Sequence, residues 1–231
     1  MSDTSPTPGS GAMFDRIAGR YDLMNRLISL GLDRRWRKRL VAEVVAAQPT
    51  RVLDLATGTA DVALGLARAL PRCAIVGLDP SRGMVLRGQQ KVQKSPLHRQ
   101  VRLALGDGQT LPFADGAFGA SCIAFGIRNV PDRLRGLREM ARVTRGPVVV
   151  LELAEPEGGA LAPLARLHAK RLVPRLGAWL SGAREYRYLQ RSVAAFPPAA
   201  EFAELMTASG LSEVRYDRLS FGAAHLYVGL A

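Results

Sequence analysis

The sequence is poor in cysteine and histidine, which limits the kinds of site it can form. Its 231 residues include two cysteines, Cys73 and Cys122, and three histidines, His98, His168 and His225. Neither cysteine has a partner at metal-ligand spacing, and both lie in apolar runs, so we predict buried free thiols in a reducing, intracellular setting. The histidines show no ligand spacing. We therefore predict no metal site and a structural role for the histidines.

Long apolar runs are also missing. No segment approaches the roughly 18 apolar residues of a membrane-spanning helix, and the N-terminus MSDTSPTPGSG lacks the basic and apolar regions of a signal peptide. We expect a cytoplasmic protein. Residues 1–11 have too little apolar surface to offset the entropy cost of ordering, so we expect a disordered leader.

Acidic residues are scarce relative to basic ones, which gives a net charge of +12. This excess of basic residues indicates binding to a nucleic acid, binding to an anionic membrane surface, or only an arginine-rich composition without a partner. The basic residues gather between Arg34 and Arg39 and again between Arg166 and Arg191. A basic RNA-binding protein without enzymatic activity is the less favoured alternative, because no aromatic-rich basic strand is present. We predict no nucleic-acid partner.

The apolar pattern predicts the architecture. Helical spacing in residues 12–47, interrupted at Gly31, predicts two N-terminal helices. Short apolar runs then alternate with helix-length segments, which predicts parallel strands with crossover helices. The predicted strands are Val52 to Leu55, Ala74 to Leu78, Val101 to Leu105, Ser121 to Phe125 and Val148 to Leu153, followed by a hairpin of Val214 to Leu219 and Leu226 to Leu230. We expect one domain, residues 12–231: a Rossmann-like, doubly wound, mostly parallel sheet of about seven strands with helices on both faces.

A candidate ligand turn follows the first predicted strand. After Asp54, small residues occupy alternate positions at Ala56, Gly58 and Ala60, with Thr59 between them. Small side chains let a ligand approach the backbone, and the free amides of the next helix favour an anionic group. Such a turn can equally serve helix packing, so alone it is a weak signal.

Two further acidic residues indicate which class of ligand the site binds. Asp79 ends the second predicted strand, where a carboxylate can accept both hydroxyls of a ribose. Asp107, with Gly108, follows the third strand, where it can meet an adenine amino group. Each residue alone could be a cap or turn residue, but three acids at successive strand ends indicate a nucleoside-like ligand. The turn has one glycine rather than the G-x-G-x-x-G of dinucleotide sites, so we predict S-adenosylmethionine, bound by Asp54, Gly58, Thr59, Asp79, Asp107 and Gly108.

From about Phe14 onward, the chain resembles the quinone C-methyltransferases of menaquinone and ubiquinone biosynthesis. The resemblance is carried by FDRIAGRYDLMNRLIS, VLDLATGTAD, GDGQTLPFADGAFGA, FGIRNV, YRYLQRSVAAFP and SFGAAHLYVG. It implies a class I S-adenosylmethionine-dependent methyltransferase that methylates a ring carbon of a polyprenyl quinol, with conversion of demethylmenaquinol to menaquinol as the favoured reaction. The benzoquinol step of ubiquinone biosynthesis, or another small-molecule or lipid acceptor, is the alternative.

The sequence departs from the family pattern at three places. Asp33 stands where a histidine is usual, three positions before Trp36, which removes any histidine-based role there. Ala124 replaces a serine before FGIRNV, and Pro147 follows a shortened turn. Because the cofactor acids and FGIRNV are intact, we expect activity to be retained.

The resemblance also assigns the substrate side of the site to Tyr21, Arg128 and Asn129. Ring carbon becomes nucleophilic when the adjacent hydroxyl is deprotonated, so the site must align the ring and stabilise a phenolate. Arg128 stays protonated in essentially all protein environments, so we assign it to the phenolate oxygen. We expect the proton to leave through a water held by Asn129 and Tyr21 towards Asp107. The alternative is that Arg128 and Asn129 only cap the helix after the fourth strand.

Residues 154–200 are predicted to form a helical cap over the substrate mouth. Its leucines, arginines and Trp179 suit contact with anionic lipid headgroups while a polyprenyl tail threads inward, although ordinary amphipathic packing explains them equally. The expected partners are thus a lipophilic quinol, a membrane surface and, for a homodimer, a second copy. The sequence leaves open the quinone, the prenyl length, the general base and the oligomeric state.

Overall fold

The computed structural model describes residues 15, 26, 29–154 and 183–231, the last range without the side chains of 183–187. Several predicted features therefore lie outside the described residues: the leader at 1–11, Tyr21, His168, most of the first helix and residues 155–182 of the cap.

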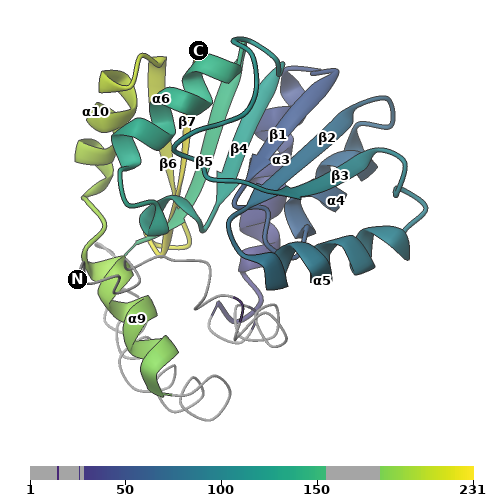
Figure 1. Cartoon of the computed structure of the whole chain (residues 1–231). Helices are drawn as coiled ribbons and strands as arrows, with labels where there is room; N and C mark the ends of the chain where they lie inside the picture. The colour runs from purple at the N-terminus through teal and green to yellow at the C-terminus, as the bar shows by residue number, and fades with distance from the viewer. Residues whose placement is uncertain (1–14, 16–25, 27–28, 155–182) are drawn as a thin grey trace, which may run out of the picture.

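Seven strands form one sheet in the order β3-β2-β1-β4-β5-β7-β6 (Figure 1). The neighbouring pairs among the first five strands are parallel, and β7 pairs antiparallel with both β5 and β6. The strands are β1 Arg51–Leu55, β2 Ala74–Asp79, β3 Val101–Leu105, β4 Ala120–Ala124, β5 Pro147–Leu153, β6 Ser212–Leu219 and β7 Ala224–Leu230. The predicted doubly wound sheet with a closing hairpin is confirmed.

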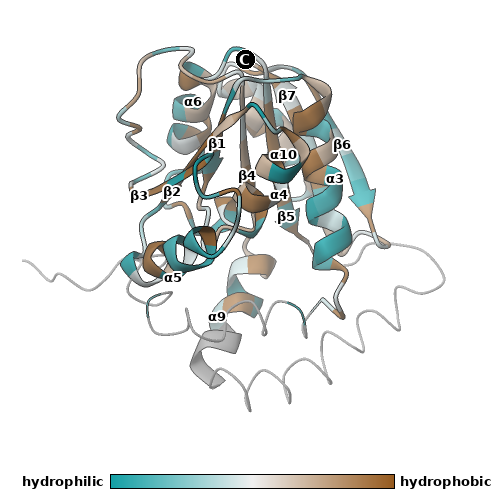
Figure 2. Ribbon diagram, turned by 90° about the vertical axis from the view of Figure 1, so that its right-hand side faces the viewer, coloured by the Kyte–Doolittle hydropathy of each residue, from teal (hydrophilic) through white to brown (hydrophobic). Residues whose placement is uncertain are grey.

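The helices form a layer on each face of the sheet. One apolar cluster joins the sheet to α3 Asp33–Ala46, α4 Asp61–Ala69 and α5 Arg82–Gln93. A second joins it to α6 Arg133–Val143 and α10 Ala199–Ala208 on the other face. Hydrophobic and hydrophilic segments alternate along α3 in Figure 2, as expected for a helix that covers a sheet on one side. Residues 148–151 of β5 are fully buried, which explains their uninterrupted apolar run.

The fourth strand ends one residue earlier than predicted. Phe125 has a φ of 58° and leaves the strand, and the short 3₁₀ helix η1 Ile127–Asn129 follows it. Helix α6 begins later and is capped by Asp132, whose side chain accepts a hydrogen bond from the Arg135 amide at 2.9 Å. The alternative that Arg128 and Asn129 cap this helix is therefore wrong.

Strands β1 to β5 all end at the same edge of the sheet, which we call the carboxyl edge. Helix α9 Ala183–Ala194, within the expected cap, lies beyond this edge (Figure 1). Helix α3 begins at the carboxyl edge, and its Trp36 donates an indole hydrogen bond to Ser220 in the β6–β7 turn at 2.9 Å. The first turn of α3 and the β6–β7 turn are thus fixed side by side.

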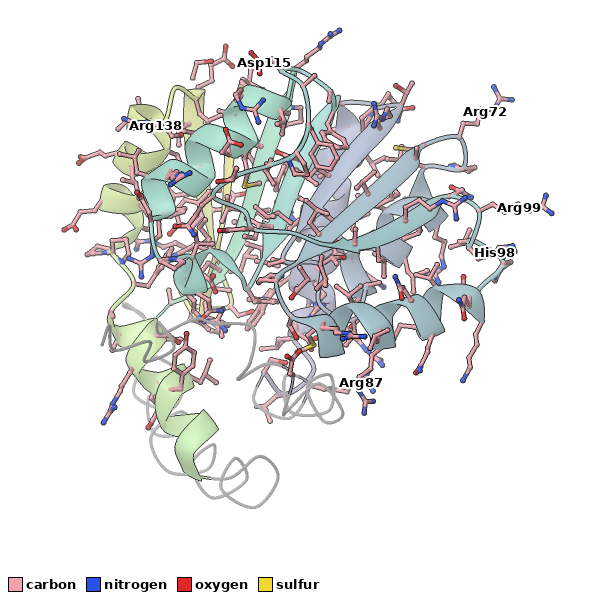
Figure 3. All side chains as sticks on the ribbon, in the orientation of Figure 1. Arg72, Arg87, His98, Arg99, Asp115 and Arg138 are labelled. Carbon is pink, nitrogen blue, oxygen red and sulfur yellow. The ribbon has the colours of Figure 1, made fainter. Side chains whose placement is uncertain are left out.

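The predicted thiols are confirmed, since Cys73 and Cys122 are both free and buried. His98 is exposed at the end of a loop (Figure 3), and His225 is buried in β7. Among the described residues, no group of histidine, cysteine, aspartate and glutamate is arranged to hold a metal ion. In that same part of the chain, no helix has the length and apolar character needed to cross a membrane.

Candidate cofactor and substrate site

The turn between β1 and α4 owes its small residues to its backbone. Ala56, Gly58 and Ala60 have φ values of 51°, 56° and 69°, all in the left-handed region. The Cβ atom crowds the backbone there, so Gly58 avoids the cost, whereas Ala56 and Ala60 keep it but avoid the larger cost of bulky or β-branched side chains. The small residues at alternate positions of this turn are therefore explained by its left-handed backbone as well as by the approach of a ligand.

Asp54 lies at the floor of this turn, almost fully buried. Its carboxylate accepts a hydrogen bond from the Thr57 hydroxyl at 2.6 Å, and the Cys122 thiol lies 3.6 Å away. Burial raises the pKa of the Asp54 carboxyl from 3.8 to about 6, against the lowering effects of Thr57, Cys122 and the charge of Arg37. A carboxylate held at this cost is typical of a ligand site.

Asp79 connects the first turn to the next one. One carboxylate oxygen accepts from the Gly58 amide and the other from the Ser81 amide, each at 2.9 Å. Burial raises its pKa; these two hydrogen bonds lower it, and the charge of Asp15 raises it further. A carboxylate has about four acceptor sites, so Asp79 keeps capacity for the hydroxyls of a ribose.

The turn after β3 is held by a network centred on Gln109. Its amide nitrogen lies 3.2 and 3.3 Å from the two carboxylate oxygens of Asp107, and its amide oxygen accepts from the Asp132 backbone at 3.0 Å. Gly108 is needed for close packing, because a Cβ there would lie 3.0 Å from a methyl carbon of Leu55. Asp107 itself is exposed and available as an acceptor.

Arg37 brings a positive charge to the site, and the sequence analysis counted it only within a basic cluster. Its guanidinium lies 3.5 Å from Asp61 and 3.7 Å from Asp33, and 5.4 Å from the centre of the Phe125 ring. Asp33, the residue that replaces the family histidine, is buried and accepts a hydrogen bond from the Ser29 hydroxyl at 2.9 Å. The departure at Asp33 thus provides an anchor for Arg37.

All these turns open into one cavity at the carboxyl edge, with a volume of about 310 Å³. This volume lies within the range of small-molecule sites. The six residues predicted to bind the cofactor all line it: Asp54, Gly58, Thr59, Asp79, Asp107 and Gly108. Arg37, Ala124, Phe125 and Asn129 line it as well. The cavity thus combines a buried carboxylate for a ribose, a turn of small residues and a cation for a carboxylate, a donor set that fits S-adenosylmethionine.

Arg128 points into the fold and does not line this cavity. Its Nη1 donates to a carboxylate oxygen of Glu152 at 2.5 Å and to the Phe125 carbonyl at 2.6 Å. The Arg128 backbone amide donates to the other oxygen of Glu152 at 3.1 Å, and Glu152 is fully buried in β5. The Glu152 carboxylate therefore binds η1 at two places, the backbone amide and the guanidinium of Arg128.

Asn129, the next residue of η1, does line the cavity. Its side-chain oxygen accepts a hydrogen bond from the Tyr188 hydroxyl of α9 at 3.0 Å. In this arrangement the Tyr188 hydroxyl is the donor, and the oxygen of the Asn129 amide faces α9. Burial raises the pKa of Tyr188, while the charges of Arg128 and Arg133 lower it.

The structure thus brings Asn129 together with the whole cofactor set and adds Arg37, Glu152 and Tyr188. Glu152 had a signal in the sequence, because a lone acid inside the apolar run VVVLEL must have a buried partner. Tyr188 lies in the YRYLQRSVAAFP motif, but nothing in the motif pairs it with Asn129. Tyr21 lies outside the described residues.

A sequence model of the ubiE/COQ5 methyltransferase family matches residues 7–231. The chain belongs to this family. It is 43% identical to the ubiquinone/menaquinone biosynthesis C-methyltransferase of Syntrophotalea carbinolica, covering 98% of this chain and 96% of that protein. It is 44% identical to the demethylmenaquinone methyltransferase of Thermus thermophilus, covering 94% and 99% of the two chains.

Solved structures show the same fold at low identity. A putative methyltransferase from Haloferax volcanii, in complex with the Trm112 activator, matches with a TM-score of 0.65 at 18% identity, over 95% of this chain and 96% of that one. An S-adenosylmethionine-dependent methyltransferase from Thermotoga maritima matches with a TM-score of 0.61 at 20% identity, over 95% and 98%. The predictions of family, of a class I methyltransferase fold and of S-adenosylmethionine as cofactor are confirmed.

Proposed function

We propose that this methyltransferase transfers a methyl group to a ring carbon of a polyprenyl quinol, with demethylmenaquinol as the acceptor. The observation that carries the proposal is the position of η1, which lies within the FGIRNV segment. Asn129 of η1 lines the same cavity as all six residues predicted to bind the cofactor. The names of relatives that cover nearly the whole chain support a quinone acceptor. The benzoquinol step is the second candidate, because the Syntrophotalea relative is named for both pathways.

The cofactor would be held at four points. Asp79 would accept the ribose hydroxyls, Asp107 would meet the adenine amino group, and Arg37 would bind the carboxylate. Asp54, ionised beside Arg37, faces the ammonium. When bound, S-adenosylmethionine supplies an electrophilic methyl group on its sulfonium.

The protein's task on the acceptor side is to make the ring nucleophilic and to align it. With its oxygen held by Tyr188, the Asn129 amide can present its NH₂ to the cavity as a donor for a phenolate oxygen. The charge of Arg128 is neutralised by Glu152, so we propose that Arg128 acts by positioning η1. From the family resemblance alone, we propose that Tyr21 acts with Asn129 to hold the water that takes the proton towards Asp107.

Product analysis tests this function. The purified chain is incubated with S-adenosylmethionine and, separately, chemically reduced demethylmenaquinol and its benzoquinol analogue. We expect a ring-methylated naphthoquinol and an equal amount of S-adenosylhomocysteine. Asn129→Ala should lower kcat by about a hundredfold, the cost of losing one donor to the developing anion, and keep cofactor binding measured by calorimetry. Preference for the benzoquinol would establish the second candidate, and cofactor binding without product from either quinol would overturn both.

A further inference from the structure

The exposed apolar side chains of this protein have an uneven distribution. Among the described residues, four large apolar side chains are exposed: Leu30, Leu86, Leu105 and Phe221. Leu105 is the last residue of β3, Leu86 lies in the second turn of the helix after β2, Phe221 lies in the β6–β7 turn, and Leu30 precedes α3. All four therefore lie at or near the carboxyl edge, at which the cavity opens, although none of them lines the cavity. Scattered exposed leucines are ordinary, but their concentration at the edge that carries a site indicates a contact surface.

Two of these residues are held outward at a conformational cost. Leu30 has a φ of 52° and is 67% exposed, and Phe221 has a φ of 60° and is 58% exposed. Bulky side chains rarely adopt left-handed backbone, and strain of this kind concentrates at functional surfaces. The hydrogen bond from Trp36 to Ser220 joins the first turn of α3 to the β6–β7 turn, so Leu30 and Phe221 lie on neighbouring segments of the carboxyl edge.

Arginines predominate among the exposed charges at this edge, where Asp15 and Asp107 are exposed as well. Arg34 and Arg35 are exposed in the first turn of α3, Arg218 is exposed before the β6–β7 turn, and Arg82 and Arg87 are exposed on α5. Arg87 projects away from the sheet below α5 in Figure 3. Apolar side chains that enter an acyl boundary, surrounded by arginines that meet phosphate, are the features of an interfacial membrane contact.

We propose that the carboxyl edge is a membrane-docking face that seats the cavity mouth on an anionic lipid bilayer, with Leu30 and Phe221 inserted and Arg34 and Arg35 on the headgroups. The occupant is a bilayer and not a protein, because the exposed apolar residues are spread along the whole edge and arginines outnumber acidic residues among the exposed charges beside them. The inference rests on the proposed function, since a polyprenyl acceptor must reach the cavity from lipid.

Vesicle flotation of the full chain tests the proposal without cofactor or quinol, so its outcome is separate from that of the product analysis. The vesicles are phosphatidylcholine alone or mixed with phosphatidylglycerol. The first variant is Leu30→Asn with Phe221→Asn, because asparagine tolerates left-handed backbone. We expect an unchanged or higher melting temperature and a loss of vesicle binding of about tenfold, from the apolar area that no longer leaves water.

A charge-matched pair gives the control. Arg34→Gln with Arg35→Gln removes two charges at the docking face, and Arg72→Gln with Arg99→Gln removes two at the amino ends of β2 and β3 (Figure 3). The first should weaken binding to anionic vesicles by about tenfold, and the second should bind as the unmodified chain does. Equal losses in the two charge variants, full binding by the asparagine variant, or no flotation of the unmodified chain would each overturn the proposal.

Discussion

At the scale of single residues, Asp54 lowers the stability of the fold and is expected to contribute to cofactor binding. Its carboxyl is buried beneath the β1–α4 turn, and burial raises its pKa to about 6. The fold therefore favours the protonated form, and ionisation at neutral pH costs free energy that the unfolded chain does not lose. The cofactor ammonium would recover part of that cost on binding.

Replacing Asp54 by asparagine should separate the two effects. The raised pKa means that the unfolded chain ionises first, so the penalty is absent below pH 4, grows between about pH 4 and 6, and is complete above. We expect Asp54→Asn to be more stable at pH 7, by at most about 3 kcal/mol, with the gap closing at pH 4. Urea unfolding at the two pH values measures this, and calorimetry should show weakened cofactor binding. An equal gap at both pH values would contradict the electrostatic origin.

Tyr188 is expected to act through the orientation of Asn129. Tyr188→Phe removes the donor that holds the amide oxygen, so the amide can turn and present its oxygen to a phenolate. We expect kcat to fall by about tenfold, the net value of one oriented hydrogen bond, with little change in the KM for S-adenosylmethionine.

A double-mutant cycle distinguishes this role from simple packing. In an Asn129→Ala background, Tyr188→Phe should have no further effect on kcat, because there is no amide left to orient. Additive losses would show that Tyr188 acts independently of Asn129.

At the scale of elements, the short 3₁₀ helix η1 depends on one buried ion pair. Glu152 binds both the backbone and the side chain of Arg128, and their side chains are 0% and 5% exposed. Removing one partner of a buried pair leaves an uncompensated charge, which typically costs about 3–5 kcal/mol. Displacing η1 also displaces Asn129.

We therefore expect Glu152→Gln to lower the free energy of unfolding by about 3 kcal/mol and to lower kcat more than it raises the KM of the cofactor. The matched control is Asp217→Asn, which breaks the exposed Arg39–Asp217 pair at 3.2 Å and should cost less than about 1 kcal/mol. Denaturant unfolding and steady-state kinetics measure both. Similar costs for the two variants would mean that the buried pair is not the support of η1.

The elements were predictable where a local pattern decides them. Apolar runs of strand length predicted the five parallel strands, because a sheet covered on both faces requires them, and the two antiparallel strands β6 and β7 were predicted as a closing hairpin. The end of β4 was missed by one residue, because the left-handed backbone of Phe125 has no signal in an aromatic side chain. The pairings of Glu152 with Arg128 and of Tyr188 with Asn129 join residues 24 and 59 positions apart. Such contacts arise from the packing of β5 and α9, which a linear pattern does not contain.

At the scale of the whole molecule, the parallel order of β1 to β5 explains why the cofactor residues could be found from the sequence. The ends of parallel strands meet at one edge, so Asp54, Asp79 and Asp107 had to converge. Arg37 was not predicted as a site residue, because it reaches the same edge from a helix before the first strand. Its contribution depends on α3 packing across the sheet, a tertiary arrangement.

The left-handed turn after β1 also bears on how such sites are compared. Ala56 and Ala60 adopt the backbone that glycine prefers, at the same spacing as Gly58. A turn with one glycine and a turn with three are therefore alternative sequences for one backbone path, separated by single substitutions that relieve strain. The path of this turn is therefore set by three left-handed positions, and glycine occupies only one of them.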